Sequence, residues 1–270
     1  MARPTWLVAL IRAGFPARFV LAGLTRWPGV GRLLEKWLFA GDDLVVLPSD
    51  RVIKIDRQVD MTDQVVLPSM LVERFINEAN YHWIMDNCIC RQASNCSDYP
   101  VSLGCLFLGE AVLGINPALG RRVSREEAMA HAEKCREAGL VHLIGRNKLD
   151  AVWLGVGPGN KLLTICNCCP CCCLWKMLPT VSGDIGDRVN KMPGVNVKVT
   201  DSCSGCGICA NDVCFINAIS MDAGMAVISA DCRGCGRCAL ACPLDAIVVE
   251  YDSSSVERAA ESIRSLVDVV

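Results

Sequence analysis

The spacing of apolar residues along the chain predicts a fold that mixes helices with strands. In the first 41 residues, an apolar set recurs at helical spacing and Gly41 is placed to end the helix. That set is Leu33, Leu34, Trp37 and Leu38. Residues 1–41 are therefore predicted to form a helical arm. The arm is basic and amphipathic, so it is expected either to dock on a membrane surface or a partner subunit, or to pack on its own domain.

Residues 42–177 are predicted to form a mixed α/β domain with two well-marked helices. Ser69 is a candidate cap for a helix over about 70–79. The sequence Ser124-Arg125-Glu126-Glu127 is a capping box, in which a hydroxyl and a carboxylate satisfy free backbone amides reciprocally. It opens a helix that is expected to run to Ala138, where Gly139 can adopt the left-handed conformation that ends it.

A β-hairpin is predicted after these helices, because residues 151–156 and 161–165 flank the turn sequence Gly157-Pro158-Gly159-Asn160. A helix followed by a hairpin is the winged-helix pattern. Nucleic-acid binding is nevertheless not expected, because the region lacks a basic recognition face. A redox- or oxygen-sensing regulator is thus the least favoured of the functions considered below.

The last third of the chain is predicted to be a small strand-rich domain. A connector over 178–194 leads to residues 195–252, where strands are expected over 195–200, 219–221, 226–228 and 247–251. Residues 253–270 are expected to form a C-terminal helix that begins with a capping sequence at 254–257. The fold class is therefore α+β: a helical arm, a mixed α/β domain and a ferredoxin-like (βαβ)2 domain.

Composition supports a packed protein and singles out cysteine. Of the 270 residues, 52% are hydrophobic and the net charge is −2, so no polyanionic partner is indicated. The 19 cysteines occur in dense groups, which favours metal ligation in a reducing compartment over a secreted disulfide scaffold. Arginines interrupt the apolar N-terminus, so no uncharged run approaches the roughly 20 residues needed to cross a bilayer. A cytoplasmic protein is expected, with membrane association through the arm as the alternative.

An internal repeat carries the clearest chemistry. Cys203, Cys206, Cys209 and Cys214 are repeated as Cys232, Cys235, Cys238 and Cys242, with the first three separated by 29 residues and the fourth by 28. Three cysteines at two-residue gaps surround three corners of a cubane cluster, and a remote cysteine supplies the fourth. In this arrangement the fourth cysteine of each motif ligates the other cluster. We therefore assign Cys203, Cys206, Cys209 and Cys242 to one [4Fe-4S] cluster and Cys232, Cys235, Cys238 and Cys214 to a second.

These motifs resemble the bacterial dicluster ferredoxins. The second motif matches fully, including Pro243, whereas the first has a longer last gap and Phe215 in place of the usual proline. The resemblance implies a ferredoxin fold and two cubane clusters. Zinc ribbons are the alternative, but they would need paired Cys-x2-Cys knuckles and fewer cysteines.

Ten further cysteines form two upstream groups that are candidate metal ligands. These are Cys88, Cys90, Cys96 and Cys105 in the first group, and Cys166, Cys168, Cys169, Cys171, Cys172 and Cys173 in the second. Together they can hold one or two additional iron–sulfur clusters, either two cubanes or one unusual cluster. Arg91 can donate hydrogen bonds to sulfur or lower a thiolate pKa. Cys135 and the three histidines, His82, His131 and His142, are expected to be packed side chains rather than ligands.

The chain from about residue 40 onward also resembles a set of cysteine-rich iron–sulfur proteins from anaerobes. The resemblance rests on Cys88-Ile89-Cys90-Arg91, on Cys96, on Tyr99-Pro100, on Cys105-Leu106 with Gly109, on residues 138–142 and on the 166–173 run. Pro170 stands where that family has glycine. The resemblance implies iron–sulfur redox work.

Two functions follow from these patterns. The first is an electron-transfer protein that relays electrons to or from a partner, a flavoprotein or another oxidoreductase. The second is an oxidoreductase whose upstream cluster binds substrate and is fed by the ferredoxin domain. The sequence has no flavin, nicotinamide or P-loop fingerprint, so any hydride-handling cofactor would belong to the partner.

Overall fold

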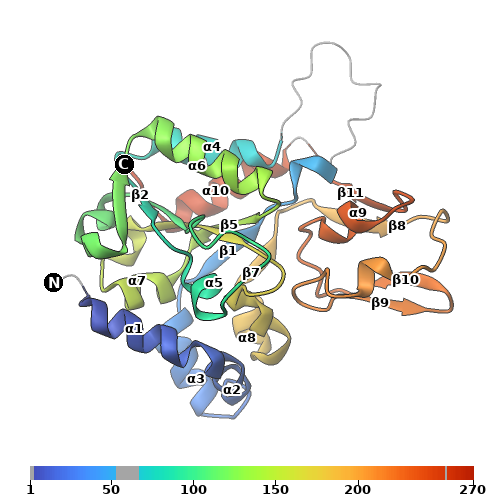
Figure 1. The fold of residues 1–270 in the computed structure, drawn as a ribbon, viewed down its shortest axis with the longest axis horizontal. Helices are drawn as coiled ribbons and strands as arrows, with labels where there is room; N and C mark the ends of the chain where they lie inside the picture. The colour runs from blue at the N-terminus through green and yellow to red at the C-terminus, as the bar shows by residue number, and fades with distance from the viewer. Residues whose placement is uncertain (1–2, 53–66, 253) are drawn as a thin grey trace.

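The structure, a computed structural model, describes residues 3–52, 67–252 and 254–270. Its centre is a seven-stranded sheet with the order β4-β2-β3-β6-β5-β1-β7 (Figure 1). Neighbouring strands are antiparallel except for β1 and β7, which are parallel. The strands are β1 (Asp43–Val46), β2 (His82–Met85), β3 (Leu106–Leu108), β4 (Gly120–Val123), β5 (Val141–Arg146), β6 (Leu163–Cys168) and β7 (Val189–Lys191). The α+β class predicted from the sequence is confirmed at this level.

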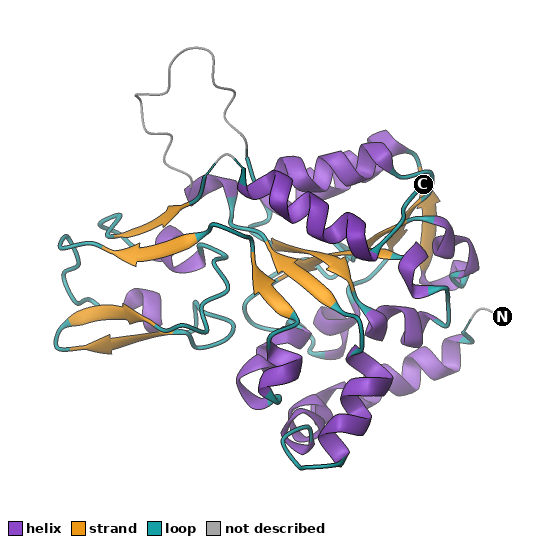
Figure 2. Ribbon diagram, turned by 180° about the vertical axis from the view of Figure 1, so that it is seen from behind, coloured by secondary structure: helices purple, strands orange, loops and turns teal. Residues whose placement is uncertain are grey.

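Three helices cover one face of the sheet: α4 (Ser69–Glu78), α6 (Arg125–Glu137) and α10 (Ser255–Leu266) (Figures 1 and 2). They pack on strand residues such as Val45 and Ile144 to form the largest apolar core. Alternate strand residues, such as Leu44 and Leu143, point to the other face, because successive side chains of a strand alternate in direction. That second face carries α5 (Ile89–Ala93), α7 (Lys148–Leu154), α8 (Gly183–Gly186) and the N-terminal arm.

The arm is helical, as its apolar spacing predicts. It consists of α1 (Thr5–Gly14), a 3-10 turn (Phe15–Ala17), α2 (Arg18–Leu24) and α3 (Val30–Leu34), which continues as a π-helical turn (Glu35–Phe39). The expectation that no N-terminal stretch could span a bilayer is wrong: the 20-residue helical stretch Thr5–Leu24 is long and apolar enough by length and composition. Counting uncharged runs missed this stretch, because a mostly apolar helix can include two arginines.

The capped helix is confirmed in detail. Ser124 Oγ accepts a hydrogen bond from the Glu127 amide, and the Glu127 carboxylate accepts one from the Ser124 amide. Gly139 follows the helix with φ +74°, in the left-handed region expected of a helix-ending glycine. At α10 the helix is present but the cap differs, since the Ser254 side chain makes no capping bond and its hydroxyl instead donates to Asp252.

The β-hairpin predicted over 151–165, and with it the winged-helix interpretation, is wrong. Residues 148–154 form α7, with Trp153 and Leu154 both buried, and Gly155 ends the helix at φ +69°. β6 is a central strand that pairs with β3 and β5. The short apolar run 151–156 fits either a strand or a helix, and its packing on the sheet decides for the helix.

The C-terminal lobe contains two antiparallel strand pairs and a short helix. The pairs are β8 (Asn196–Val199) with β11 (Ile247–Glu250), and β9 (Ile219–Asp222) with β10 (Met225–Ile228); the helix is α9 (Arg237–Ala241). All four strands lie where they were predicted. Residues 178–194, expected as a connector, contain α8 and the edge strand β7. Short 3-10 helices also occur in the described residues, at Asp50–Val52, Glu110–Gly114, Pro117–Leu119, Gly159–Lys161, Leu174–Thr180 and Ile208–Ala210.

Candidate metal centres

The C-terminal lobe gathers its eight motif cysteines into two sets of four. Cys242 lies with the first three cysteines of the first motif around one small cavity, and Cys214 lies with the first three of the second motif around another. We call the first the distal set (Cys203, Cys206, Cys209 and Cys242) and the second the proximal set (Cys232, Cys235, Cys238 and Cys214). The side chains are thus grouped in the crossed pattern that the repeat predicts.

Backbone geometry in both sets suits sulfur ligands. Gly205 and Gly234 occupy equivalent positions of the two loops and have φ +72° and +69°. At Gly205 an added Cβ would lie 2.2 Å from the Gly224 carbonyl oxygen, so only glycine fits this tight loop. The amides of Ala218 and Ala246 donate to the Cys214 and Cys242 sulfurs over 3.3 Å each. Such N–H···S bonds stabilise anionic sulfur at a metal site.

Burial separates the two sets. Burial raises the pKa of Cys235 to about 11 and that of Cys238 to about 12, so both thiols are neutral without metal and release protons when they bind it. In the distal set Cys206 is exposed, and hydrogen bonds from the Ala226 and Gly205 amides lower the pKa of Cys203. The distal set therefore reaches solvent through Cys206, although Cys209 is buried, whereas the proximal set packs against the rest of the protein.

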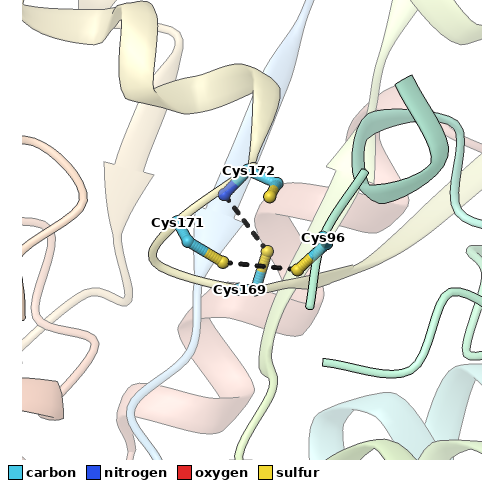
Figure 3. Close-up of side chains that lie close together, drawn as sticks. All are labelled: Cys96, Cys169, Cys171 and Cys172. Carbon is cyan, nitrogen blue, oxygen red and sulfur yellow. Dashed lines mark hydrogen bonds between the residues drawn. The ribbon is translucent and has the colours of Figure 1, made fainter. Parts of the chain in front are cut away.

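Four of the upstream cysteines converge at one point, which we call the four-cysteine site (Figure 3). Cys96 comes from the loop after α5, and Cys169, Cys171 and Cys172 come from the loop after β6. All four sulfurs lie within 4.8 Å of one another, and the Cys96 and Cys171 sulfurs are 3.5 Å apart. Four converging thiols form a complete ligand set for a tetrahedral metal ion or for a cubane cluster.

The other six upstream cysteines line a second site, which we call the six-cysteine site. They surround part of a cavity of about 380 Å³ and are Cys88, Cys90, Cys105, Cys166, Cys168 and Cys173. Cys169 of the four-cysteine site borders the same cavity. The Cys105 and Cys166 sulfurs lie 3.9 Å apart. Segments far apart in the chain supply these residues, so the site exists only in the folded sheet. The N-terminal arm forms the opposite wall of the cavity, through Leu7, Ile11 and Phe15 among others.

Arg91 lies between the two upstream sites and is fully buried. Its guanidinium donates to the backbone oxygens of Asn167 (2.8 Å) and Leu103, and its Nε has no partner among the described residues. Burial alone would lower the pKa of Arg91, but the nearby sulfurs of Cys88 and Cys169 raise it overall. A buried cation without a carboxylate partner destabilises the folded protein, so negative charge close to Arg91 would be stabilising. Thiolate-ligated clusters on either side would supply that charge, and the residues therefore fit such groups.

The three histidines are packed side chains, as expected from the sequence. His82 Nε2 lies 2.7 Å from the Ile76 carbonyl oxygen, and His131 Nε2 lies 2.9 Å from that of Gly104. His142 pairs with the Asn167 side chain, and burial lowers its pKa to about 4, so it is neutral. Cys135 is fully buried beside His131 and belongs to none of the cysteine sets.

Two features of the sites have little or no signal in the sequence. Arg237, next to Cys238 of the proximal set, is buried and donates to the backbone oxygen of Cys168 in the six-cysteine site. Its place inside the second motif is the only signal the sequence offers. The arm wall of the cavity has no signal, because nothing in residues 1–41 is typical of a metal site.

Comparison with known proteins supports an iron–sulfur site in the C-terminal lobe. The 4Fe-4S binding domain family matches residues 225–248, which contain all four cysteines of the second motif. The chain therefore contains an iron–sulfur domain of the ferredoxin type and holds at least one [4Fe-4S] cluster. No curated protein and no solved structure matches the chain. Together with the upstream cysteine groups, the match supports an iron–sulfur protein that works in electron transfer.

Proposed function

We propose that this protein relays electrons through a row of iron–sulfur sites to or from a partner oxidoreductase. In this proposal the distal and proximal sets each hold a [4Fe-4S] cluster in a dicluster ferredoxin domain. The six-cysteine and four-cysteine sites hold one or two further clusters. The partner is a flavoprotein or another oxidoreductase that supplies the hydride chemistry.

The observation that carries the proposal is the contact between the two halves of the molecule. Arg237 ties the proximal loop to Cys168, and the Ser49 amide donates to the Cys235 oxygen over 3.2 Å. Cys235 also shares one apolar cluster with Cys173 of the six-cysteine site. The four sites thus follow one another in the order distal, proximal, six-cysteine and four-cysteine. The exposed Cys206 marks the distal end as the place where a soluble partner can approach.

Metal analysis of anaerobically purified protein tests the proposal. If both upstream sites hold four-iron clusters, about 16 irons and an equal amount of sulfide are expected per chain. A value near eight would leave the upstream sites without clusters and overturn the relay. About 12 irons with one zinc would instead assign the four-cysteine site to zinc, whose tetrahedral thiolate geometry suits closely spaced sulfurs.

Serine substitutions locate the upstream clusters. Replacing Cys171, Cys172 and Cys173 together removes ligands from both upstream sites, so only ferredoxin-type signals should remain in electron paramagnetic resonance spectra. Cys135→Ala is the matched control, because this buried thiol lies beside the four-cysteine site without joining it. The control should keep the full iron content.

A second candidate function is an oxidoreductase that binds substrate at the six-cysteine site. The cavity favours it: seven cysteines line the space, the six of this site and Cys169, which is more than a cubane needs, and apolar side chains including Trp153 and Leu174 complete the wall. Spectroscopy of the assembled protein distinguishes the two functions. If every upstream iron has a cysteine ligand, the enzymatic alternative loses its support.

A further inference from the structure

We propose that the outward face of the N-terminal arm docks the protein on an anionic lipid surface. We call this surface the arm face. It consists of large apolar side chains that are at least 39% exposed: Trp6, Leu10, Phe19, Val20, Leu21, Trp27, Val30, Leu33 and Trp37. Among them, Leu21 also borders the six-cysteine cavity. These are nine of the nineteen exposed large hydrophobic residues in the part of the chain that the structure describes. Apolar surface gathered in one segment marks an interaction site, whereas single exposed residues need no explanation.

The composition of the arm face matches a membrane interface. Trp6, Trp27 and Trp37 are each 63–67% exposed, although tryptophan is usually well buried in a soluble domain. Indole rings concentrate at the headgroup level of bilayers, where one end is apolar and the other is wet. α1, α2 and α3 lie together along one end of the molecule, the lower edge in Figures 1 and 2, so these side chains can meet one surface.

The charged residues of the arm differ in their contacts, and Arg18 donates to the Phe15 carbonyl oxygen within the arm itself. Arg3 and Arg26 bond backbone oxygens of the body, at Val152 and Pro179, and so hold the arm in place. The one acidic residue of the arm, Glu35, is neutralised by an ion pair of 2.5 Å with Arg188 of the body. Arg12, Arg32 and Lys36 are exposed, and their side chains form no ion pair within the described residues. The free charge of the arm face is therefore purely basic, which suits an anionic lipid surface and disfavours a second copy of the same arm.

The arm lies along the surface of the protein rather than projecting from it. Phe15 and Ala22 are buried against the body, and the 3-10 turn with Pro16 interrupts the helix between α1 and α2. A helix anchored along one side in this way suits the plane of the interface, with only its outer face in lipid. Because Leu7 and Ile11 on its inner side line the six-cysteine cavity, docking would bring that cavity next to the membrane.

Vesicle sedimentation of the anaerobically purified full chain tests the proposal. The protein should sediment with vesicles of phosphatidylcholine and phosphatidylglycerol, and far less with phosphatidylcholine alone. Replacing Arg12, Arg32 and Lys36 with glutamine should weaken binding roughly a hundredfold, at about fivefold for each basic residue near the surface. Replacing Trp6, Trp27 and Trp37 with serine should weaken it at least about tenfold. Absence of sedimentation with the anionic vesicles would overturn the proposal.

Two controls test whether binding is specific to the arm face and confined to the interface plane. Leu33→Ser should reduce binding, whereas Leu113→Ser, at a residue of similar exposure elsewhere (48% against 56%), should not. Equal losses in the two variants would refute a specific face. High salt should release the bound protein, so release by detergent alone would show that the segment 5–24 crosses the bilayer and would overturn docking in the interface plane. Self-association that disappears in the tryptophan variant, without vesicle binding, would assign the face to a second copy and would likewise overturn the proposal.

Discussion

Replacing Arg91 with glutamine removes a positive charge that is buried between the two upstream sites. The side chain is fully buried and has no carboxylate partner among the described residues. If clusters occupy both sites, the guanidinium stabilises their reduced, more negative states. The variant should therefore lower the reduction potentials of both upstream clusters.

The size of the effect follows from Coulomb's law. A unit charge about 8 Å from a cluster contributes roughly 2 kcal/mol at an effective dielectric constant of about 20. For a one-electron couple this corresponds to a shift of roughly 90 mV, since a tenfold change in the equilibrium constant is about 59 mV. The loss of the hydrogen bonds to Asn167 and Leu103 also destabilises the fold, by about 1.5–3 kcal/mol for each bond.

Redox titration followed by electron paramagnetic resonance measures these shifts. Arg91→Lys keeps the charge and should keep most of the potential, although it cannot reproduce both hydrogen bonds. Arg121→Gln is a surface control, because this arginine is 58% exposed and its ion pair with Glu127 should not influence the clusters. The ferredoxin-type signals of the distal set should not move. Unchanged upstream potentials in a folded Arg91→Gln protein with full iron content would refute the role assigned to this charge.

Three further predictions concern the fold and its local geometry. Asp42 is buried, which raises its pKa to about 7. Between about pH 4 and pH 7 the unfolded chain ionises this carboxyl more readily than the folded protein does, so the free energy of unfolding falls as the pH rises through this range. Asp42→Asn should therefore match the wild type near pH 4 and exceed it by roughly 2–4 kcal/mol above pH 7 in denaturant titrations, and a gain that does not change with pH would contradict this. Ser124→Ala breaks the capping box of α6 and should cost about 1 kcal/mol, whereas Ser97→Ala in an exposed loop should cost little; equal losses would argue against the cap. Gly205→Ala places a Cβ 2.2 Å from the Gly224 oxygen and should disrupt the distal set, so iron analysis should show about four irons fewer. Gly183→Ala, where the added Cβ meets open space, should keep the full iron content.

Local sequence determined the elements whose signals are short-range. The capping box at Ser124 and Glu127 and the ending glycine at Gly139 fix α6 from residues adjacent in the chain, and both are present. The repeat of cysteines and glycines likewise predicts that Cys214 and Cys242 exchange partners, and the structure groups them in that way. A tight loop around a metal depends on two-residue gaps and on glycine dihedrals, which the sequence encodes directly.

Only the tertiary structure decided how the upstream cysteines divide. Cys168 and Cys169 are neighbours in the chain and both line the cavity, yet β6 ends there and only Cys169 converges with Cys96, Cys171 and Cys172. Cys96 joins Cys171 across 75 residues because the loop after α5 passes the loop after β6. Tertiary packing also decided that residues 151–154 are helical rather than a strand, and that the arm lies over the cavity. These features depend on which faces of the sheet are buried against which helices, and non-local packing of that kind overrides short apolar patterns.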